Sequence, residues 1–580
     1  MKLALLGSSA MALAAGGADA NNGDPAYLSY DGGAAIVFDS GPSTLNTPGA
    51  SVGLSFEGIS QYDTRALNGG FSFIPPDTMG AIGATQFMET TNGGYAVYDK
   101  RTGAQTLLES DGTFWTKAGQ VEGTYPNGLP LANGDSRVLF DGRSQRWIVE
   151  SFAATLDKIQ IAVSNTSDAT GGWKSTTFTG FAGGIADYPT LAIDDKAVYI
   201  GTNDFTPVAG GGFSYAGETL SVINRNDLFG PSAPHVGDIK QFFTSLPALL
   251  AGNDRGYALQ GVNQTGNTTG KIVAVGANDF GLLTYDINKP GKGNATQGAV
   301  TLLSPNSAYD VNGPGRQPYT TGTGDPRVID TLDDRVSSAV WEQNGKIYAV
   351  HTITPTGTDH TEVQWQVIDA ASNTILATGA IGGNGDGYDY YQGSIAVNSS
   401  GQVVIGYDRS GTDVTTGKIS VFAQSFNSLH GGGLTSTGTF LLHVSNTDSY
   451  HNGSTDGLAA AGRQRWGDYS QVSLDPNNGE SFWVIGQFAR EFNDVAGGHP
   501  GGTGGSRWGT WITDLVLSPV RGDDDGGSIG NPGGDGGSRF GKSIAGLVLS
   551  AVPEPATWSM MLIGFGLVGG ALRRRVAKTA

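Results

Sequence analysis

The sequence predicts an all-β fold for most of the chain, and two observations carry that prediction. Only 15% of the 580 residues are charged, while 92 are glycine, a composition suited to short strands joined by tight turns. Between residues 70 and 518 a unit also recurs, in which a polar start precedes two short apolar strands separated by a turn. Apolar residues alternate in these runs, with Gly, Asn or Asp between them, which is the pattern of β-hairpins.

The recurring unit also predicts how the strands are arranged. Its copies begin at Asp77, Asp135, Asp187, Ala258, Asp334, Tyr391 and Gly467. Repeats of about 50–75 residues, each with three or four strands, are typical of the blades of a propeller. We therefore expect a β-propeller over residues 71–518, with seven blades; six or eight blades stay open, and tandem β-sandwiches are the alternative architecture.

The N-terminal region contains two predicted features. Residues 1–20 have the features of a secretory signal peptide, with Lys2, an apolar stretch and the small-x-small site Ala18-Asp19-Ala20. Residues 21–70 form an N-terminal segment. Its apolar run from Ala34 to Phe38 is expected to complete the last blade beside Trp511 and its neighbours.

The C-terminal region has the composition of a linker followed by a short membrane-targeting segment. Residues 519–551 are rich in Gly and Asp, which predicts a disordered linker. In residues 552–580, Pro553-Glu554-Pro555 precedes an apolar stretch from Trp558 to Leu572, and three arginines follow. This stretch predicts one short hydrophobic helix, below the twenty or so residues of a stable span, with its basic end on the cytoplasmic side. We expect only a transient contact with the inner membrane.

The segment VPEPATWSMMLIGFGLVGGALRRR resembles the PEP-CTERM sorting tail, in the variant with Trp just after the motif. The resemblance implies export in a Gram-negative bacterium that makes exopolysaccharide. It also implies that an exosortase-type enzyme processes the tail and that the protein reaches the cell surface or the extracellular matrix. The residues that carry the sorting signal are then Pro553, Glu554, Pro555, Trp558, Arg573, Arg574 and Arg575.

The body of the chain resembles exported bacterial propeller proteins, in phrases such as PPDTMGAIGATQFMETTN, DYPTLAID and RWGDYSQVSLDP. This resemblance implies the fold and says little about chemistry. The absence of cysteine from the sequence excludes disulfides and thiol nucleophiles. A net charge of −19 disfavours nucleic acid as a partner, because an acidic surface repels phosphate.

Sialidases are the enzyme class to compare, since they are propellers that cleave sugars. Asp168 and Trp173 keep the spacing of the sialidase Asp-box, although the turn glycine is displaced, and such boxes shape turns away from the active site. An arginine cluster would be needed for a substrate carboxylate, with Arg137, Arg327 and Arg465 as candidates. The catalytic candidates are Asp187, Asp468, Tyr469 and Arg465. The alternative is that Asp-Tyr at a strand start, as at Tyr188, forms a turn and a packing contact.

Two further candidate sites are non-catalytic. Arg463, Arg465 and Trp466 form a dense polar-aromatic patch that could stack on a sugar ring and hydrogen-bond its hydroxyls; the alternative places the Trp466 ring in the core between blades. Asp386 and Asp389 lie in an oxygen-rich segment that could hold calcium, or form an ordinary turn. No other cofactor is expected.

Together these features predict an exported surface or matrix protein whose propeller binds exopolysaccharide or another envelope component without catalysis. A secreted glycan hydrolase and a purely structural matrix protein are the two alternatives.

Overall fold

The computed structural model describes residues 50–519, except for 71–72, 122, 125–127, 210–211, 232–233, 238, 278–280, 304–308, 311–314, 319, 321–327, 384, 449, 451–463 and 493–505. The chain divides into two compact units, Met1–Val520 and Arg521–Ala580, and all described residues belong to the first. The predicted signal peptide, linker and sorting tail lie outside the described residues.

Most sheets are antiparallel and consist of strands that follow one another along the chain. The first has β2 (Met79–Ile82), β3 (Gln86–Thr91), β4 (Gly94–Asp99) and β5 (Gln105–Glu109). The second has β6 (Gly134–Asp141), β7 (Arg146–Phe152), β8 (Lys158–Ser164) and β9 (Trp173–Thr179). The third has β10 (Ile185–Asp187), β11 (Ala192–Ile193), β12 (Ala197–Pro207), β13 (Phe213–Asn224) and β14 (Ile239–Ser245).

A larger sheet follows, in which two strand runs are joined by a parallel pair. The first run has β15 (Tyr257–Asn263), β16 (Gly270–Val275), β17 (Leu282–Asn288), β18 (Thr296–Gln297) and β19 (Thr301–Leu302). The second run has β22 (Val340–Gln343), β23 (Lys346–Pro355), β24 (Glu362–Asp369) and β25 (Thr374–Ile381), with β20 (Tyr309–Asp310) beside β23. The parallel pair joins β15 to β22.

Two more sheets and a short pair complete the described strands. One sheet has β26 (Tyr388–Val397), β27 (Gln402–Gly411), β28 (Ser420–Ser428) and β29 (Leu434–Val444). The other has β31 (Gln471–Leu474), β32 (Ser481–Phe492), β33 (Ser506–Leu517) and β1 (Ala50–Ser60). The short parallel pair is β21 (Ile329–Asp330) with β30 (Gln464–Arg465). The described helices are short: α2 (Gln61–Leu67), α3 (Asp111–Lys117), α4 (Arg225–Phe229) and α5 (Leu246–Leu250).

Contacts between the sheets form a closed cycle. Strand β31 contacts β2, which contacts β6, and β8 contacts β10. From there β12 contacts β15, β15 contacts β22, β23 contacts β26, and β26 contacts β31. Sheets that pack side by side in a cycle define a β-propeller, whereas tandem sandwiches would pair sheets face to face. The predicted propeller is confirmed; dividing the large sheet at β15 and β22 is compatible with seven blades, but the blade count stays a prediction.

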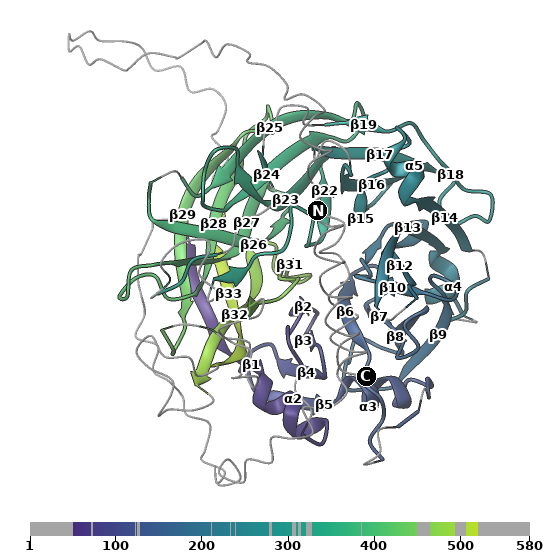
Figure 1. Cartoon of the computed structure of the whole chain (residues 1–580), viewed down its shortest axis with the longest axis horizontal. Helices are drawn as coiled ribbons and strands as arrows, with labels where there is room; N and C mark the ends of the chain where they lie inside the picture. Colours follow the sequence, from purple (N-terminus) through teal and green to yellow (C-terminus); the bar gives the residue numbers. More distant parts are fainter. Residues whose placement is uncertain are drawn as a thin grey trace, which may run out of the picture. The chain divides into compact units, whose positions relative to one another are not determined.

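The last sheet combines strands from the two ends of the described chain. Strand β1 pairs antiparallel with β33, with Ser55, Phe56 and Glu57 opposite Thr513, Ile512 and Trp511; Figure 1 shows β1 in purple beside the yellow-green β33 and β32. The run from Ala34 to Phe38, which was expected at this place, lies outside the described residues. The strand observed beside Trp511 is thus Ala50–Ser60.

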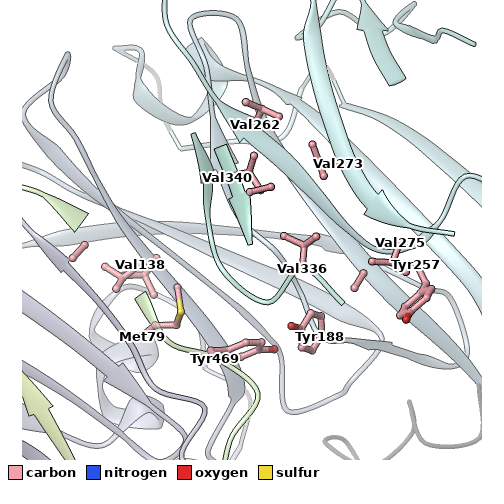
Figure 2. Close-up of a cluster of buried hydrophobic side chains, with 14 of the residues drawn as sticks. Met79, Val138, Tyr188, Tyr257, Val262, Val273, Val275, Val336, Val340 and Tyr469 are labelled. Atoms are coloured by element: carbon pink, nitrogen blue, oxygen red, sulfur yellow. The ribbon is translucent and has the colours of Figure 1, made fainter. Parts of the chain in front are cut away.

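The largest buried cluster draws side chains from several sheets. It includes Met79 on β2, Val138 on β6, Tyr257 and Val262 on β15, and Val340 on β22 (Figure 2). Tyr188 and Tyr469 lie next to each other in the same cluster, with ring centroids 4.9 Å apart. These two tyrosines join the apolar core to a group of buried charged residues.

Candidate functional site

Backbone irregularities occur in and beside the inner strands near this charged group. The residues with left-handed backbone there, φ between 48° and 56°, are Asp77, Asp135, Tyr188, Ala258 and Gln392. Three of them fall where the strand register shifts, in β6, β15 and β26, which marks β-bulges. Asp and Asn tolerate this conformation better than most residues, and bulges turn side chains in directions that a regular strand cannot.

At several of these irregular positions the backbone N–H donates a hydrogen bond to a side chain from the neighbouring sheet. Asn92 Oδ1 accepts from Asp135 N at 3.0 Å and Asn203 Oδ1 accepts from Ala258 N at 3.1 Å. Thr352 Oγ1 accepts from Gln392 N at 3.1 Å. Asp77 Oδ1 accepts from Asp468 N at 2.8 Å, which links the first inner strand to the last. These side-chain bonds therefore join the irregular strand positions to residues of the adjacent sheet.

We use "central polar cluster" for nine charged and tyrosine residues that interact with one another in and beside these strands. Its members are Asp77, Asp135, Arg137, Asp187, Tyr188, Arg335, Arg465, Asp468 and Tyr469. All are buried, with at most 8% of any residue exposed. The cluster therefore belongs to the interior of the propeller.

The carboxyl groups in the cluster hold their protons more tightly than carboxyls in water. Burial, with the nearby charges of Asp187 and Asp468, raises the pKa of Asp135 to about 8. Burial and the charge of Asp468 raise the pKa of Asp187 to about 7, and the pKa of Asp77 is raised for the same kinds of reason. Desolvation disfavours the ionised form and the neighbouring carboxylates repel it. At neutral pH the cluster therefore carries fewer negative charges than its aspartates could supply.

Arginines balance the remaining charge. Arg465 Nη2 donates to Asp468 Oδ1 at 3.0 Å. Arg335 binds Asp333 with two hydrogen bonds of 2.7 and 2.8 Å and lies 4.2 Å from the centroid of the Tyr188 ring. The Arg137 guanidinium lies 3.6 Å from the centroid of the Tyr469 ring, a cation–π contact strengthened by burial.

The structure thus brings together most of the predicted catalytic residues, but places them in the core. Arg137 and Arg465 lie in one cluster with Asp187, Asp468 and Tyr469, while Arg327 lies outside the described residues. Asp187 is 1% exposed, Asp468 2% and Tyr469 0%. This burial agrees with the alternative in which Asp-Tyr at a strand start forms a turn and a packing contact.

The predicted binding patch is also internal where the structure describes it. Trp466 is fully buried, its indole Nε1 donates to Asp408 Oδ2 at 2.7 Å, and its ring meets that of Tyr450 edge-on. Arg465 is 8% exposed, and Arg463 lies outside the described residues. The position of Trp466 is the one expected if its ring fills the core between blades.

The candidate calcium ligands are bonded to protein groups. Asp389 accepts from the backbone N and the guanidinium of Arg316 and from Thr361 N. Asp386 accepts from Tyr388 N and from Tyr390 Oη, both at 2.9 Å. Within the described part of the chain, no group of three or more His, Asp or Glu side chains is arranged to hold a metal ion.

The Asp-box-like segment forms a turn, as boxes of this kind do. Asp168 Oδ1 accepts from Thr170 N and Oγ1 and from Gln86 Nε2. Trp173 Nε1 donates to Ala169 O at 2.9 Å. These bonds tie the turn between β8 and β9 to β3 of the neighbouring sheet.

Several residues that the sequence did not single out, together with Asp386, surround a surface depression of about 330 Å³ on the sheet β26–β29. Tyr390 on β26 is paired with Arg409 on β27, and Tyr407 on β27 is paired with Phe422 on β28. Because alternate residues of a strand share a face, these side chains and Tyr388 gather on one side of the sheet. The sequence signal for this site is the alternation of Tyr407 and Arg409 in VIGYDRSG, which places both side chains on one face of a strand. The sequence alone does not show which side chains of the neighbouring strands lie beside them.

Comparison with known proteins identifies the C-terminal tail. Residues 551–575 match the family model of the PEP-CTERM protein-sorting motif. The chain carries a PEP-CTERM sorting motif. Such a motif marks an exported protein that is processed at its C-terminus. The sorting residues lie outside the described part of the structure, in which no helix is long and apolar enough to cross a membrane.

Other comparisons concern the body of the chain. A search of curated proteins found no relative. Solved structures similar to the chain include a protein of unknown function from Dyadobacter fermentans, with a TM-score of 0.37 and 11% identity over 81% of this chain and 100% of that one. The WD40 domain of Toxoplasma gondii coronin has a TM-score of 0.34 and 10% identity, covering 82% of this chain and 90% of that one. An endo-arabinase of Bacteroides thetaiotaomicron has a TM-score of 0.24 and 12% identity, covering 67% of this chain and 94% of that one. Similarity at this level says nothing about the chemistry of this chain.

Proposed function

We propose that this PEP-CTERM protein is delivered by an exosortase-type system to the cell surface or matrix, where its propeller binds extracellular polysaccharide without cleaving it. The observation that carries binding over catalysis is the burial of the predicted catalytic groups, since Asp187, Asp468 and Tyr469 are each at most 2% exposed. A polymer substrate has to reach its catalytic acid, and general acid–base chemistry requires hydrogen-bond distance. The side chains around Arg409, by contrast, line an open depression.

Hydrolysis is the second candidate function, and one observation favours it. The pKa of Asp187 is raised to about 7 and that of Asp135 to about 8, and a carboxyl that keeps its proton near neutrality suits a general acid. An opening of the propeller that exposes these groups would be needed for such a reaction. A purely structural role in the matrix is the third candidate.

The test is a binding and cleavage assay with the full chain and polysaccharide from the cells that make it. Retention of the polysaccharide with no release of reducing ends supports the binding role. Release of reducing ends that Asp187→Asn abolishes establishes the hydrolase instead. If the polysaccharide is neither retained nor cleaved, the structural role is favoured.

The sorting part of the proposal has its own test in the basic end of the tail. Replacing Arg573, Arg574 and Arg575 with Ala removes the charges that hold this end on the cytoplasmic side. We expect the variant to remain cell-associated and unprocessed, measured by fractionation and by the mass of the mature chain. Normal processing and surface delivery of the triple variant would contradict the role given to these arginines.

A further inference from the structure

The strongest unassigned feature is the environment of Arg409. Its guanidinium carbon lies 4.1 Å from the centroid of the Tyr388 ring and 4.2 Å from that of Phe422. The Tyr407 ring stacks on Phe422 at 5.7 Å and is tilted against Tyr390 at 5.8 Å. Aromatic contacts of this kind hold a guanidinium in place while leaving its N–H donors at the edge of the plane.

A second feature of Arg409 is that its guanidinium has no acidic partner within the described residues. No carboxylate there lies within ion-pair distance of it, whereas Arg316, Arg335 and Arg465 each bind an aspartate. Asp386, which lines the same depression, accepts instead from Tyr390 Oη at 2.9 Å. The Arg409 side chain also hydrogen-bonds Tyr390, so the site presents the remaining donors of a fixed guanidinium and an exposed acceptor from Asp386.

The depression beside these groups has the size and lining of a small ligand site. Its volume of about 330 Å³ is at the lower end of the range for ligand pockets. Besides Arg409 and Asp386, it is lined by Tyr390, Tyr407, Gln424 and Thr439. Strand β25 of the neighbouring sheet contributes Ala380 and Ile381. Donors and acceptors thus surround a volume with an apolar wall on one side.

The mixture of groups favours a neutral polyhydroxylated ligand. Each sugar hydroxyl both donates and accepts a hydrogen bond, so it can use Arg409 as donor and Asp386 as acceptor. One positive and one negative side chain give the site little net charge. The chain as a whole carries a net charge of −19, which repels anionic polymers.

We propose that the depression on the face of β26, β27 and β28 binds a neutral sugar unit of the extracellular polysaccharide, with Arg409 and Asp386 hydrogen-bonding its hydroxyls. This inference rests on the proposed polysaccharide-binding function and names the site that performs it. Tyr407, which is 4% exposed, and Gln424 line the same depression.

The test measures binding of the full chain to polysaccharide isolated from the producing cells and separated into neutral and acidic fractions by anion exchange. Two variants report on the site. Arg409→Met removes the donors while retaining an unbranched side chain beside the rings, and Tyr407→Phe removes only a hydroxyl. We expect Arg409→Met to weaken binding to the neutral fraction about tenfold or more, the effect of losing a charge-assisted hydrogen bond, and Tyr407→Phe to weaken it less.

The matched control is His430→Ala. His430 is an exposed residue in a second depression, of about 920 Å³, which is lined by hairpin turns such as those at Lys346 and Asp369. We expect this variant to bind as the unchanged chain does. Circular dichroism and the thermal midpoint of each variant show whether it is folded. If Arg409→Met does not fold, the binding measured with Tyr407→Phe decides whether the site is correct.

The outcomes separate the site from the function. If the unchanged chain binds the neutral fraction and both site variants bind equally well, the site is elsewhere, although the proposed function stands. If the unchanged chain binds neither fraction, the proposed function fails and the site with it. A preference for the acidic fraction that depends on Arg409 would overturn the assignment of a neutral sugar.

Discussion

The hydrogen bond between the Trp466 indole and Asp408 distinguishes a packing role from a binding role for this tryptophan. The ring is fully buried, and burial raises the pKa of Asp408 to about 8. Trp466→Ala would leave a cavity and an unbonded carboxyl. We expect it to lower the free energy of unfolding by about 3–5 kcal/mol, measured by urea denaturation.

Asp408→Asn is the matched control for Trp466→Ala. The Asn side chain keeps an oxygen that can accept from the indole N–H at 2.7 Å, and it resembles the protonated carboxyl. We expect a change of less than about 1 kcal/mol at pH 7. An unchanged unfolding curve for Trp466→Ala, together with lost polysaccharide binding, would show that Trp466 serves binding after all.

The buried carboxyls give the folded state a preference for mild acid. In the unfolded chain an Asp side chain has its ordinary pKa of 3.8, whereas in the fold the pKa of Asp187 is about 7 and that of Asp135 about 8. Between these values the unfolded state binds fewer protons, so the contribution of these groups to stability is greatest below about pH 4 and is lost as the pH rises through 7 to 8. Each tenfold difference in proton affinity between the two states corresponds to about 1.4 kcal/mol.

We therefore expect a higher urea midpoint at pH 5 than at pH 8, and a smaller difference in Asp187→Asn. Asp168→Asn is the control, because Asp168 is exposed and its pKa is lowered by bonds from Gln86 and Thr170. A midpoint that rises from pH 5 to pH 8 would contradict the raised pKa values.

At the scale of elements, neighbouring sheets approach closely where a glycine leaves room. A Cβ on Gly201, in β12, would lie 2.2 Å from the backbone O of Leu259 in β15. Gly201→Ala would therefore push two adjacent sheets apart. We expect a loss of about 1–3 kcal/mol in the free energy of unfolding.

Gly142 provides the comparison for Gly201. It lies in an exposed turn, and a Cβ there has no heavy atom within 4 Å. We expect Gly142→Ala to change the free energy of unfolding by less than about 0.5 kcal/mol. Equal effects of the two substitutions would show that the contact between β12 and β15 is not as close as described.

The strand pairs of each element could be predicted from the sequence because they are local. The repeat that starts at Asp135 corresponds to strands β6 and β7, and the repeat that starts at Ala258 corresponds to strands β15 and β16. Hairpins bring residues a few positions apart into register, so alternation and turn residues suffice to identify them. The partner of β33 lies at the opposite end of the described chain, and no local pattern distinguishes it from other apolar runs in the N-terminal segment.

The candidate sites were harder to predict for a related reason. Trp466 and Arg465 have the composition of a sugar-binding patch, and only the packing of several sheets shows that they are buried. Arg409 looks like an ordinary strand residue until Tyr390 and Phe422 are brought beside it by pairing across three strands. Composition indicates what a side chain can do, but burial decides whether it meets a ligand.

At the scale of the whole molecule, the pairing of β1 with β33 completes the last sheet with a strand from the start of the described chain. Deletion of residues 50–60 would remove the partner of β33 and expose an unpaired strand edge. We expect the deleted chain to unfold at lower urea and to be cut by protease near residues 506–517. Recovery of resistance on adding a synthetic peptide of residues 50–60 would show that pairing is what was lost, whereas an unchanged unfolding midpoint would show that β1 is dispensable.

The same pairing fixes the order in which an exported chain can be completed. If the chain is exported N-terminus first, β1 emerges early, but its partner follows only at residues 506–517, so the N-terminal strand has to wait for most of the chain. The sorting motif begins at residue 551 and emerges just after that partner. A chain that stalls or is cut before residue 506 can neither complete its last sheet nor present its tail, so a chain that presents its tail for processing already holds both strands of the pair that completes that sheet.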